Sequence, residues 1–295
     1  METLRDIFNP QFPLHNSIYV SLLVGLCCPL VGIYLILRRL IFMGVALPQI
    51  SSAGIALVFA LPALGVVGHH HIAHFKGDEH LMAFIGALSL TFGAILLLAF
   101  LERRGRGLPE GRIGVAYAVA SATGILLLAK NPMGELGLLD MLKGQIIAVS
   151  NMDLILTLVI LGIVTATLLL FQKEFLLVSF DRDMAVILKK KVLFWDTLLF
   201  LLIGLATSIA VLSVGPLVTF GFLLLPPLIA QVFARNMYQF CGFACAIGAV
   251  ASFVGFCLAY SWDLPVGPTD VALLGIIYGE AVIIREFYIH IVKTR

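Results

Sequence analysis

The sequence predicts an all-α membrane protein that crosses the bilayer several times. Three observations support this class: 61% of the 295 residues are hydrophobic, only 12% are charged, and several uncharged stretches are long. Such stretches exceed the roughly 20 residues that a helix needs to cross a bilayer. The mean hydropathy of +1.07 excludes a soluble globule. Nothing in the composition indicates nucleic-acid binding.

Apolar stretches between charged breaks define about eight or nine membrane segments. They are residues 17–37, 41–67, 82–101, 112–129, 154–172, 197–213, 215–233, 238–260 and 269–287. The first stretch is too long for the apolar core of a cleavable signal peptide. The stretch 215–233 contains Pro216, Gly221, Pro226 and Pro227, so it fits either one span or two half-helices. We expect the whole chain, 1–295, to form one membrane domain, with its helix bundle over 17–287.

The loops between these segments differ in charge. One set of alternate loops holds 15 of the 19 Lys and Arg residues, and the other holds only Arg5, Lys76, Lys130 and Lys143. Because basic loops stay in the cytoplasm, we expect the N-terminus outside and the C-terminus in the cytoplasm.

One predicted cytoplasmic segment is unusually charged. Nine charged residues lie between Lys173 and Asp196, and a bilayer cannot host them. Within 179–191, the stretch Ser179–Leu188 predicts a short helix: Asp181 suits its N-cap, Asp183 its first turn, and Lys189–Lys191 its C-terminal end. Apolar side chains would then share one face of this helix. Such a helix between two spans predicts a docking surface for a cytoplasmic partner.

Four short segments carry a family resemblance. Residues 142–154 read LKGQIIAVSNMDL and resemble LxGxxLAVSxxDL, and residues 180–185 read FDRDMA and resemble FDPxxA. Residues 214–217 followed by 225–235 resemble VGxLLxxxxLxxPAAxAR, and residues 263–268 read DLPVGP. In this order and topology, the segments are similar to the membrane permeases of zinc, manganese and iron ABC importers, the ABC-3 family. The resemblance covers roughly residues 17–285.

The resemblance implies a permease subunit of a bacterial inner-membrane importer that works by alternating access. Such a subunit has no catalytic site and binds no cofactor itself. Its implied partners are a second permease copy, a cytoplasmic ABC ATPase that binds ATP and Mg²⁺, and a periplasmic or extracellular solute-binding protein. The segment 179–191 corresponds to the family's coupling segment. The implied contacts to the ATPase are Phe180, Asp181, Met184, Ala185, Ile187 and Leu188.

One further stretch aligns with the family but departs from it where a metal would bind. Residues 38–54 align without gaps to RRMSxxGDALSHAxLxG, which puts the family's Asp on Val45 and its His on Gln49. Asp and His four residues apart share a helix face and could line a path for a cation. Valine cannot bind a cation and a glutamine amide is a weak ligand, so the stretch poorly suits Zn²⁺. Gln49, Ser51 and Ser52 remain candidates to line a path, or equally to hydrogen-bond between helices.

Two carboxylates invite a functional interpretation. Glu110 aligns with the family's next acidic position, in DAxIG, at the predicted cytoplasmic mouth; it is either a path residue or a solvated charge. Glu280 lies inside the apolar run 272–284, where acidic residues are a functional hypothesis by default. Arg285 lies a turn away and offers an ion-pair explanation instead.

The predicted outer loop, 68–81, is rich in metal-binding residue types. Five of the seven histidines lie there with two carboxylates. The residues are His69, His70, His71, His74, Asp78, Glu79 and His80. In a helix, His70 and His74 would have the i, i+4 spacing that binds Zn²⁺ or Cu²⁺. The loop would concentrate metal or seat the binding protein, or it is a polar loop with a fortuitous histidine run.

Three other functions compete with the metal importer. A membrane di-iron desaturase needs several histidine boxes on the cytoplasmic face, and only His15 and His290 lie outside the loop. A proton-coupled transporter needs a relay of buried acidic or histidine side chains, for which only Glu280 qualifies. An ABC permease for a non-metal or chelated-metal substrate is favoured by Val45 and Gln49.

Overall fold

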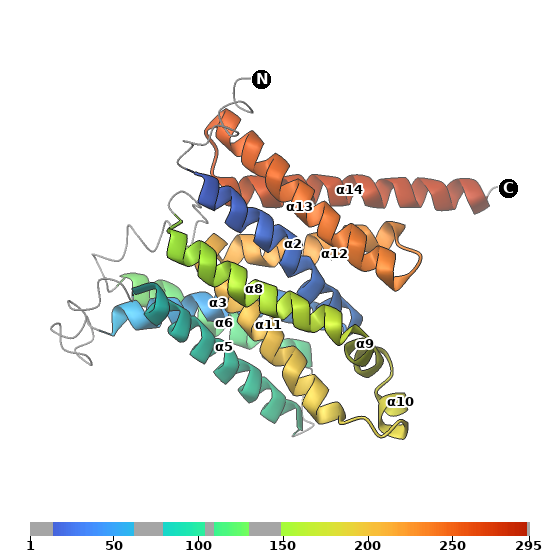
Figure 1. Cartoon of the computed structure of the whole chain (residues 1–295), viewed down its shortest axis with the longest axis horizontal. Helices are drawn as coiled ribbons and strands as arrows, with labels where there is room; N and C mark the ends of the chain where they lie inside the picture. Colours follow the sequence, from blue (N-terminus) through green and yellow to red (C-terminus); the bar gives the residue numbers. More distant parts are fainter. Residues whose placement is uncertain (1–13, 62–78, 104–108, 130–148, 294–295) are drawn as a thin grey trace.

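The computed structural model describes residues 14–61, 79–103, 109–129 and 149–293, and the regular elements within these ranges are all helices (Figure 1). They are α2 (His15–Leu37), α3 (Ile41–Ala60), α5 (Glu79–Arg103), α6 (Pro109–Ala129), α8 (Asn151–Leu170), α9 (Gln172–Phe180), α10 (Arg182–Ile187), α11 (Val192–Val214), α12 (Pro216–Phe233), α13 (Met237–Trp262) and α14 (Val266–Lys293). The prediction of an all-α fold is confirmed.

Eight of the described helices are long and apolar enough to cross a membrane, namely α2, α3, α5, α8, α11, α12, α13 and α14. The fourth predicted segment, 112–129, is not among these eight and lies in the 21-residue helix α6, which packs on α3. The second predicted segment, 41–67, is longer than the observed helix, because α3 ends at Ala60. Residues 62–67 lie outside the described ranges. The predicted multi-span architecture is therefore confirmed.

The stretch 215–233 forms one helix rather than two half-helices. Gly215 alone separates α11 from α12, with a φ of 84°. Glycine adopts this φ without steric cost, and proline suits the first helical position because its missing N–H would be unpaired there. From Pro216, α12 continues through Pro226 and Pro227 to Phe233. It packs against α2, α3, α13 and α14, and these neighbours stabilise a helix that its sequence alone would weaken.

The helices divide into two groups (Figure 1). In the first group, α2 packs against α8, α12 and α13, and α14 packs against α12 and α13. In the second group, α3 packs chiefly against α5 and α6. α11 and α12 contact helices of both groups. Although α2 and α3 are consecutive, only Arg38–Leu40 join them, and each packs mainly within its own group.

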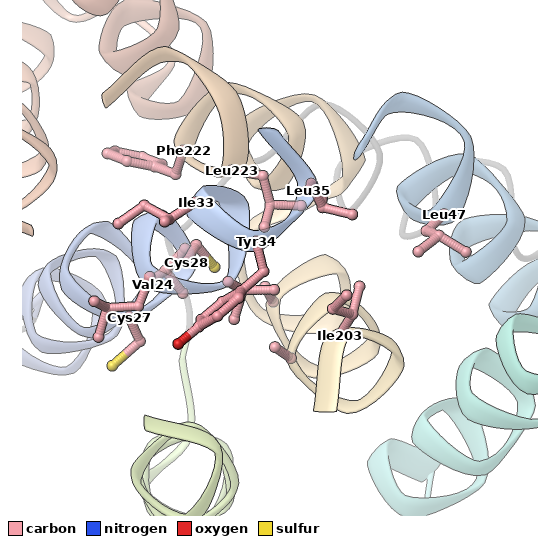
Figure 2. Packing of buried hydrophobic residues seen from close by; sticks show 14 of the residues in the cluster. Val24, Cys27, Cys28, Ile33, Tyr34, Leu35, Leu47, Ile203, Phe222 and Leu223 are labelled. Carbon is pink, nitrogen blue, oxygen red and sulfur yellow. The ribbon is translucent and has the colours of Figure 1, made fainter. Parts of the chain in front are cut away.

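Apolar side chains fill the space between these helices. Figure 2 shows part of this core, in which Ile33 of α2, Leu47 of α3, Ile203 of α11 and Phe222 of α12 belong to one cluster of buried residues. Helix backbones come close at glycines: a Cβ at Gly25 of α2 would lie 2.7 Å from a carbonyl oxygen of α13. Small residues permit such approach, which favours helix association in lipid.

Candidate coupling site and buried polar groups

The segment 172–191 forms two short helices, α9 and α10, with Asp181 between them (Figure 1). The Asp181 carboxylate accepts a hydrogen bond from the backbone N–H of Met184 at 2.8 Å. The N-cap predicted at Asp181 is therefore confirmed. Ser179 and Phe180, the first residues of the predicted stretch, belong to the end of α9, and the cap turns the chain before α10 begins.

The C-terminal end of α10 is closed by its own backbone. The N–H of Lys189 bonds to the carbonyl of Val186 at 2.9 Å, and the N–H of Lys190 bonds to that of Ala185 at 3.0 Å. Lys189 has a φ of 55°, which completes the Schellman arrangement that commonly ends helices. The lysines follow the helix as predicted, where cations suit its dipole.

The residues predicted to contact an ATPase differ in burial. Four apolar side chains, all between 46% and 74% exposed, are those of Phe180, Met184, Ile187 and Leu188. Asp181 is also exposed, as an N-cap at the surface. Ala185 is instead fully buried, in a cluster with Val178 and Val192. Ala185 therefore packs α10 against α9 and α11. The exposed side chains of Phe180, Met184, Ile187 and Leu188 form an apolar surface, which we call the α10 surface.

An aromatic contact anchors this segment to the bundle. Phe175 of α9 is fully buried, and its ring meets that of Tyr34 in α2 at 5.9 Å between centroids and that of Trp195 in α11 at 5.5 Å. Both pairs are edge-to-face, the arrangement that the aromatic quadrupole favours. α9 is therefore held against α2 and α11 together.

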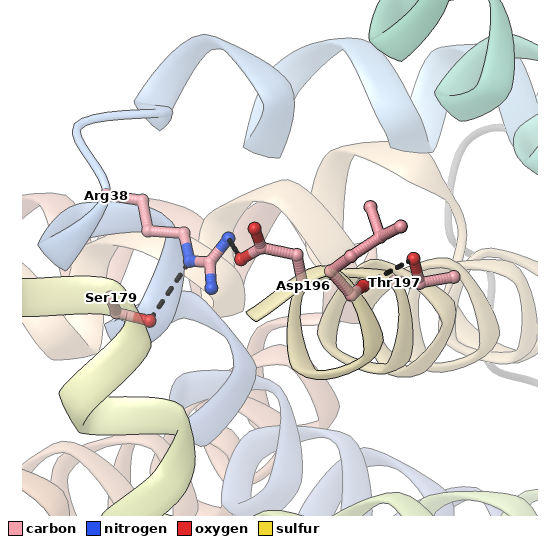
Figure 3. Close-up of polar contacts among 5 residues, drawn as sticks. Arg38, Ser179, Asp196 and Thr197 are labelled. Carbon is pink, nitrogen blue, oxygen red and sulfur yellow. Dashed lines mark hydrogen bonds and ion pairs between the residues drawn. The ribbon is translucent and has the colours of Figure 1, made fainter. Parts of the chain in front are cut away.

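A polar contact joins the same three helices. Figure 3 shows Arg38, directly after α2, between α9 and α11: Nη1 lies 2.8 Å from Oδ1 of Asp196, and Nε donates to Oγ of Ser179 at 3.0 Å. The guanidinium also lies 5.5 Å from the ring centroid of Phe200. The Arg38 and Asp196 side chains are only 12% and 15% exposed, so solvent screens this pair less than a surface ion pair.

The predicted path residues lie on α3 and at the start of α6. Gln49 and Val45 are half-buried and Ser52 is buried. Ser51 is fully buried, with no hydrogen-bond partner among the described residues. Glu110 is exposed in the first turn of α6. No hydrogen bond or ion pair found within the described ranges links Glu110 to the polar residues of α3, so the structure does not unite these candidates into one site.

Asp270 of α14 is a buried carboxylate that the sequence analysis missed. Its side chain is fully buried, and neither carboxylate oxygen has a hydrogen-bond partner among the described residues. It packs against Gly255 of α13, where a Cβ would collide with the carboxylate. Nearby in the chain, the Ser252 hydroxyl pairs with that of Ser21 in α2 at 2.7 Å. Asp270 is the second residue of the predicted segment 269–287. At that position it resembles a charge at the membrane boundary, although it already lies inside the segment.

Glu280, the acid singled out from the sequence, is exposed. Within the described part of the chain, no ion pair joins Glu280 to Arg285. The predicted ion-pair explanation is therefore not met by the structure.

The histidine-rich loop lies mostly outside the described residues. His69, His70, His71, His74 and Asp78 fall in the gap at 62–78. Glu79 and His80 are the first two residues of α5. Among the side chains that the structure describes, His, Cys, Asp and Glu form no group of three or more suited to hold a metal ion.

Comparison with known proteins gives concordant findings. The family model described as the ABC 3 transport family matches residues 12–285. The chain is 28% identical over 265 residues to the manganese transport system membrane protein MntC of Listeria monocytogenes, covering 90% of this chain and 88% of that protein. It is 26% identical, with the same coverage, to the manganese import system permease protein ScaB of Streptococcus gordonii. The structure of PsaBC from Streptococcus pneumoniae in complex with Fab has the same fold, with a TM-score of 0.80 and 24% identity over 95% of this chain and 94% of that one.

Proposed function

The chain belongs to the ABC 3 transport family, and from this premise we propose that it is the membrane-spanning permease subunit of an ATP-driven importer for a divalent transition-metal ion. The observation that carries the proposal is the α10 surface at one end of a multi-span helix bundle. In this role the chain has no catalytic site. A partner ATPase binds and hydrolyses ATP with Mg²⁺.

The α10 surface suits a cytoplasmic ATPase. Its exposed apolar side chains lie on a segment fixed by the buried Ala185 and Phe175, so the surface is pre-organised for binding. Lys189–Lys191 follow α10 directly and favour the cytoplasmic side. Orientation follows: the N-terminus lies outside the bacterial inner membrane, where a solute-binding protein delivers the ion, and the C-terminus lies in the cytoplasm.

Manganese is the ion that we assign to this permease. Two relatives of similar length are named for manganese transport. The polar groups along α3, Gln49, Ser51 and Ser52, are oxygen donors apart from one amide nitrogen, and Mn²⁺ suits oxygen ligands better than Zn²⁺ does. A non-metal or chelated-metal substrate is the second candidate, because Val45 and Gln49 supply no charged ligand.

Transport in this scheme is by alternating access in a dimer of permeases. ATP binding moves the α10 surface of each subunit, and the two helix groups change their relative position. The path residues on α3 are then exposed first to the outside and afterwards to the cytoplasm. The histidines of the loop 68–81 concentrate the metal ion at the outer entrance.

Uptake of radiolabelled Mn²⁺, Zn²⁺ and Fe²⁺ tests this function. Cells that produce the ATPase and the solute-binding protein are compared with and without this chain. Energy-dependent accumulation of Mn²⁺ only in cells with the chain is expected. No difference for any ion contradicts a metal importer and favours the second candidate. Uptake in vesicles that contain this chain but no ATPase contradicts ATP-driven transport.

A further inference from the structure

We propose that Arg38 is a positioning residue that passes movement of the coupling segment to the turn between the two helix groups. The inference rests on the proposed function, in which the α10 surface binds an ATPase. It identifies one contact, which lies outside the docking surface, as the link between ATP hydrolysis and transport. The contact consists of the Arg38 guanidinium with Ser179 and Asp196 (Figure 3).

The turn that carries Arg38 is closed by backbone hydrogen bonds. The N–H of Arg39 bonds to the carbonyl of Ile36 at 3.0 Å, and the N–H of Leu40 bonds to that of Leu35 at 2.8 Å. Arg39 has a φ of 57°, so the end of α2 is a Schellman motif. Since α3 begins at the next residue, Ile41, a displacement of this turn acts on the start of α3 as well as on the end of α2.

The Arg38 side chain connects this turn to both flanks of the coupling segment. Ser179 lies two residues before the N-cap of α10, and Asp196 lies in α11, after α10. Arg38 and Asp196 are mostly buried, and separating such a pair leaves each charge poorly solvated. The coupling segment and the turn therefore move together rather than separately.

The helices beyond this turn belong to different groups. α2 packs with α8, α12 and α13, whereas α3 packs with α5 and α6. Gln49 lies eight residues after Ile41, which is about 12 Å along a helix. α3 remains one helix from Ile41 to Ala60 although Pro48 removes one of its backbone hydrogen bonds, so a displacement of its first turn reaches the polar residues of its middle. Arg38 thus connects the docking side to the candidate path.

Neighbouring contacts lack this geometry. Arg39 is exposed, and its side chain makes no hydrogen bond or ion pair within the described ranges. Lys190 and Glu174 approach to 3.8 Å, but both belong to the segment 172–191 and reach no spanning helix. The Phe175 ring contacts Tyr34 of α2 and Trp195 of α11, but Tyr34 lies inside α2, before the turn that leads to α3.

The first test measures transport per ATP hydrolysed in the reconstituted importer. Arg38→Gln is expected to keep ATP hydrolysis within about twofold and to lower Mn²⁺ transported per ATP about tenfold, in the range of coupling between distant sites. Arg38→Lys keeps the charge but loses the guanidinium fork. Its Mn²⁺ transported per ATP is expected to lie between the values of the parent and of Arg38→Gln. The matched control, Arg39→Gln on the same turn, is expected to behave like the parent. An unchanged ratio in Arg38→Gln, or an equal loss in Arg39→Gln, overturns the proposal.

The second test needs no transport. Spin labels are placed on cysteines substituted for Ile187 of α10 and Phe42 of α3, both exposed, in a protein whose native cysteines are replaced. In lipid nanodiscs, the parent and Arg39→Gln are expected to give one narrow distance distribution, and Arg38→Gln a broader one. Equal widths in all three overturn the proposal. If the parent transports no ion, the proposed function fails, while this distance measurement still decides the role of Arg38.

Discussion

Shortening Ile187 to alanine tests the α10 surface most directly. The side chain is 74% exposed, and Ile→Ala removes three carbon atoms. At about 0.8 kcal/mol for each buried carbon, an ATPase that covers the exposed three-quarters of Ile187 gains about 1.8 kcal/mol from the deleted atoms. This corresponds to about a 20-fold rise in Kd for the variant.

The binding assay uses the purified protein in nanodiscs and the ATPase as analyte in biolayer interferometry. The matched control is Ile163→Ala, because Ile163 is 58% exposed but lies on the spanning helix α8. Its Kd is expected to equal that of the parent. An unchanged Kd for Ile187→Ala, or the same rise for Ile163→Ala, would refute the docking role of the α10 surface.

Three further predictions concern the bundle. Gly248→Ala should lower the melting temperature in detergent because its Cβ meets the Gly25 carbonyl, whereas Gly242→Ala on the same helix has open space and should not; equal shifts would contradict this packing. Asp270→Asn should keep Mn²⁺ uptake within about twofold, because no described cation pairs with the carboxylate; abolished uptake would show that the charge itself is needed. Ser150→Ala should destabilise α8 by about 1 kcal/mol in chemical unfolding, since Ser150 caps it, and no loss would argue against the cap.

Local chemistry made several features predictable. Asp181 as an N-cap and Lys189–Lys191 after the helix depend on residues within one or two turns of chain. The spans were predictable because hydrocarbon demands long apolar helices. The AVSxxDL match also has a local cause, because Ser150 and Asp153 form the capping box of α8.

Features that depend on neighbouring helices were not predictable in this way. Ala185 looks like one more residue of an amphipathic helix, but Val178 and Val192 cover it. Asp270 looks like a boundary charge, but Gly255 leaves the space that encloses it. The continuity of α12 through two prolines likewise depends on the helices around it. In each case the deciding atoms belong to neighbouring helices and not to the helix that carries the residue.

The arrangement of α3 separates two properties that an importer must combine. The turn before its start contacts the coupling segment through Arg38 and Ser179, whereas its middle carries Gln49, where the family pattern has a metal-binding residue type. A substitution at Gln49 changes groups that could contact the ion but leaves the Arg38 contact untouched. Gln49→His is therefore expected to raise Zn²⁺ uptake relative to Mn²⁺ without changing ions transported per ATP. Arg38→Gln should do the opposite, lowering ions per ATP for both metals equally. If Gln49→His instead lowers transport per ATP and leaves the ratio of the two metals unchanged, ion choice does not reside on this face of α3.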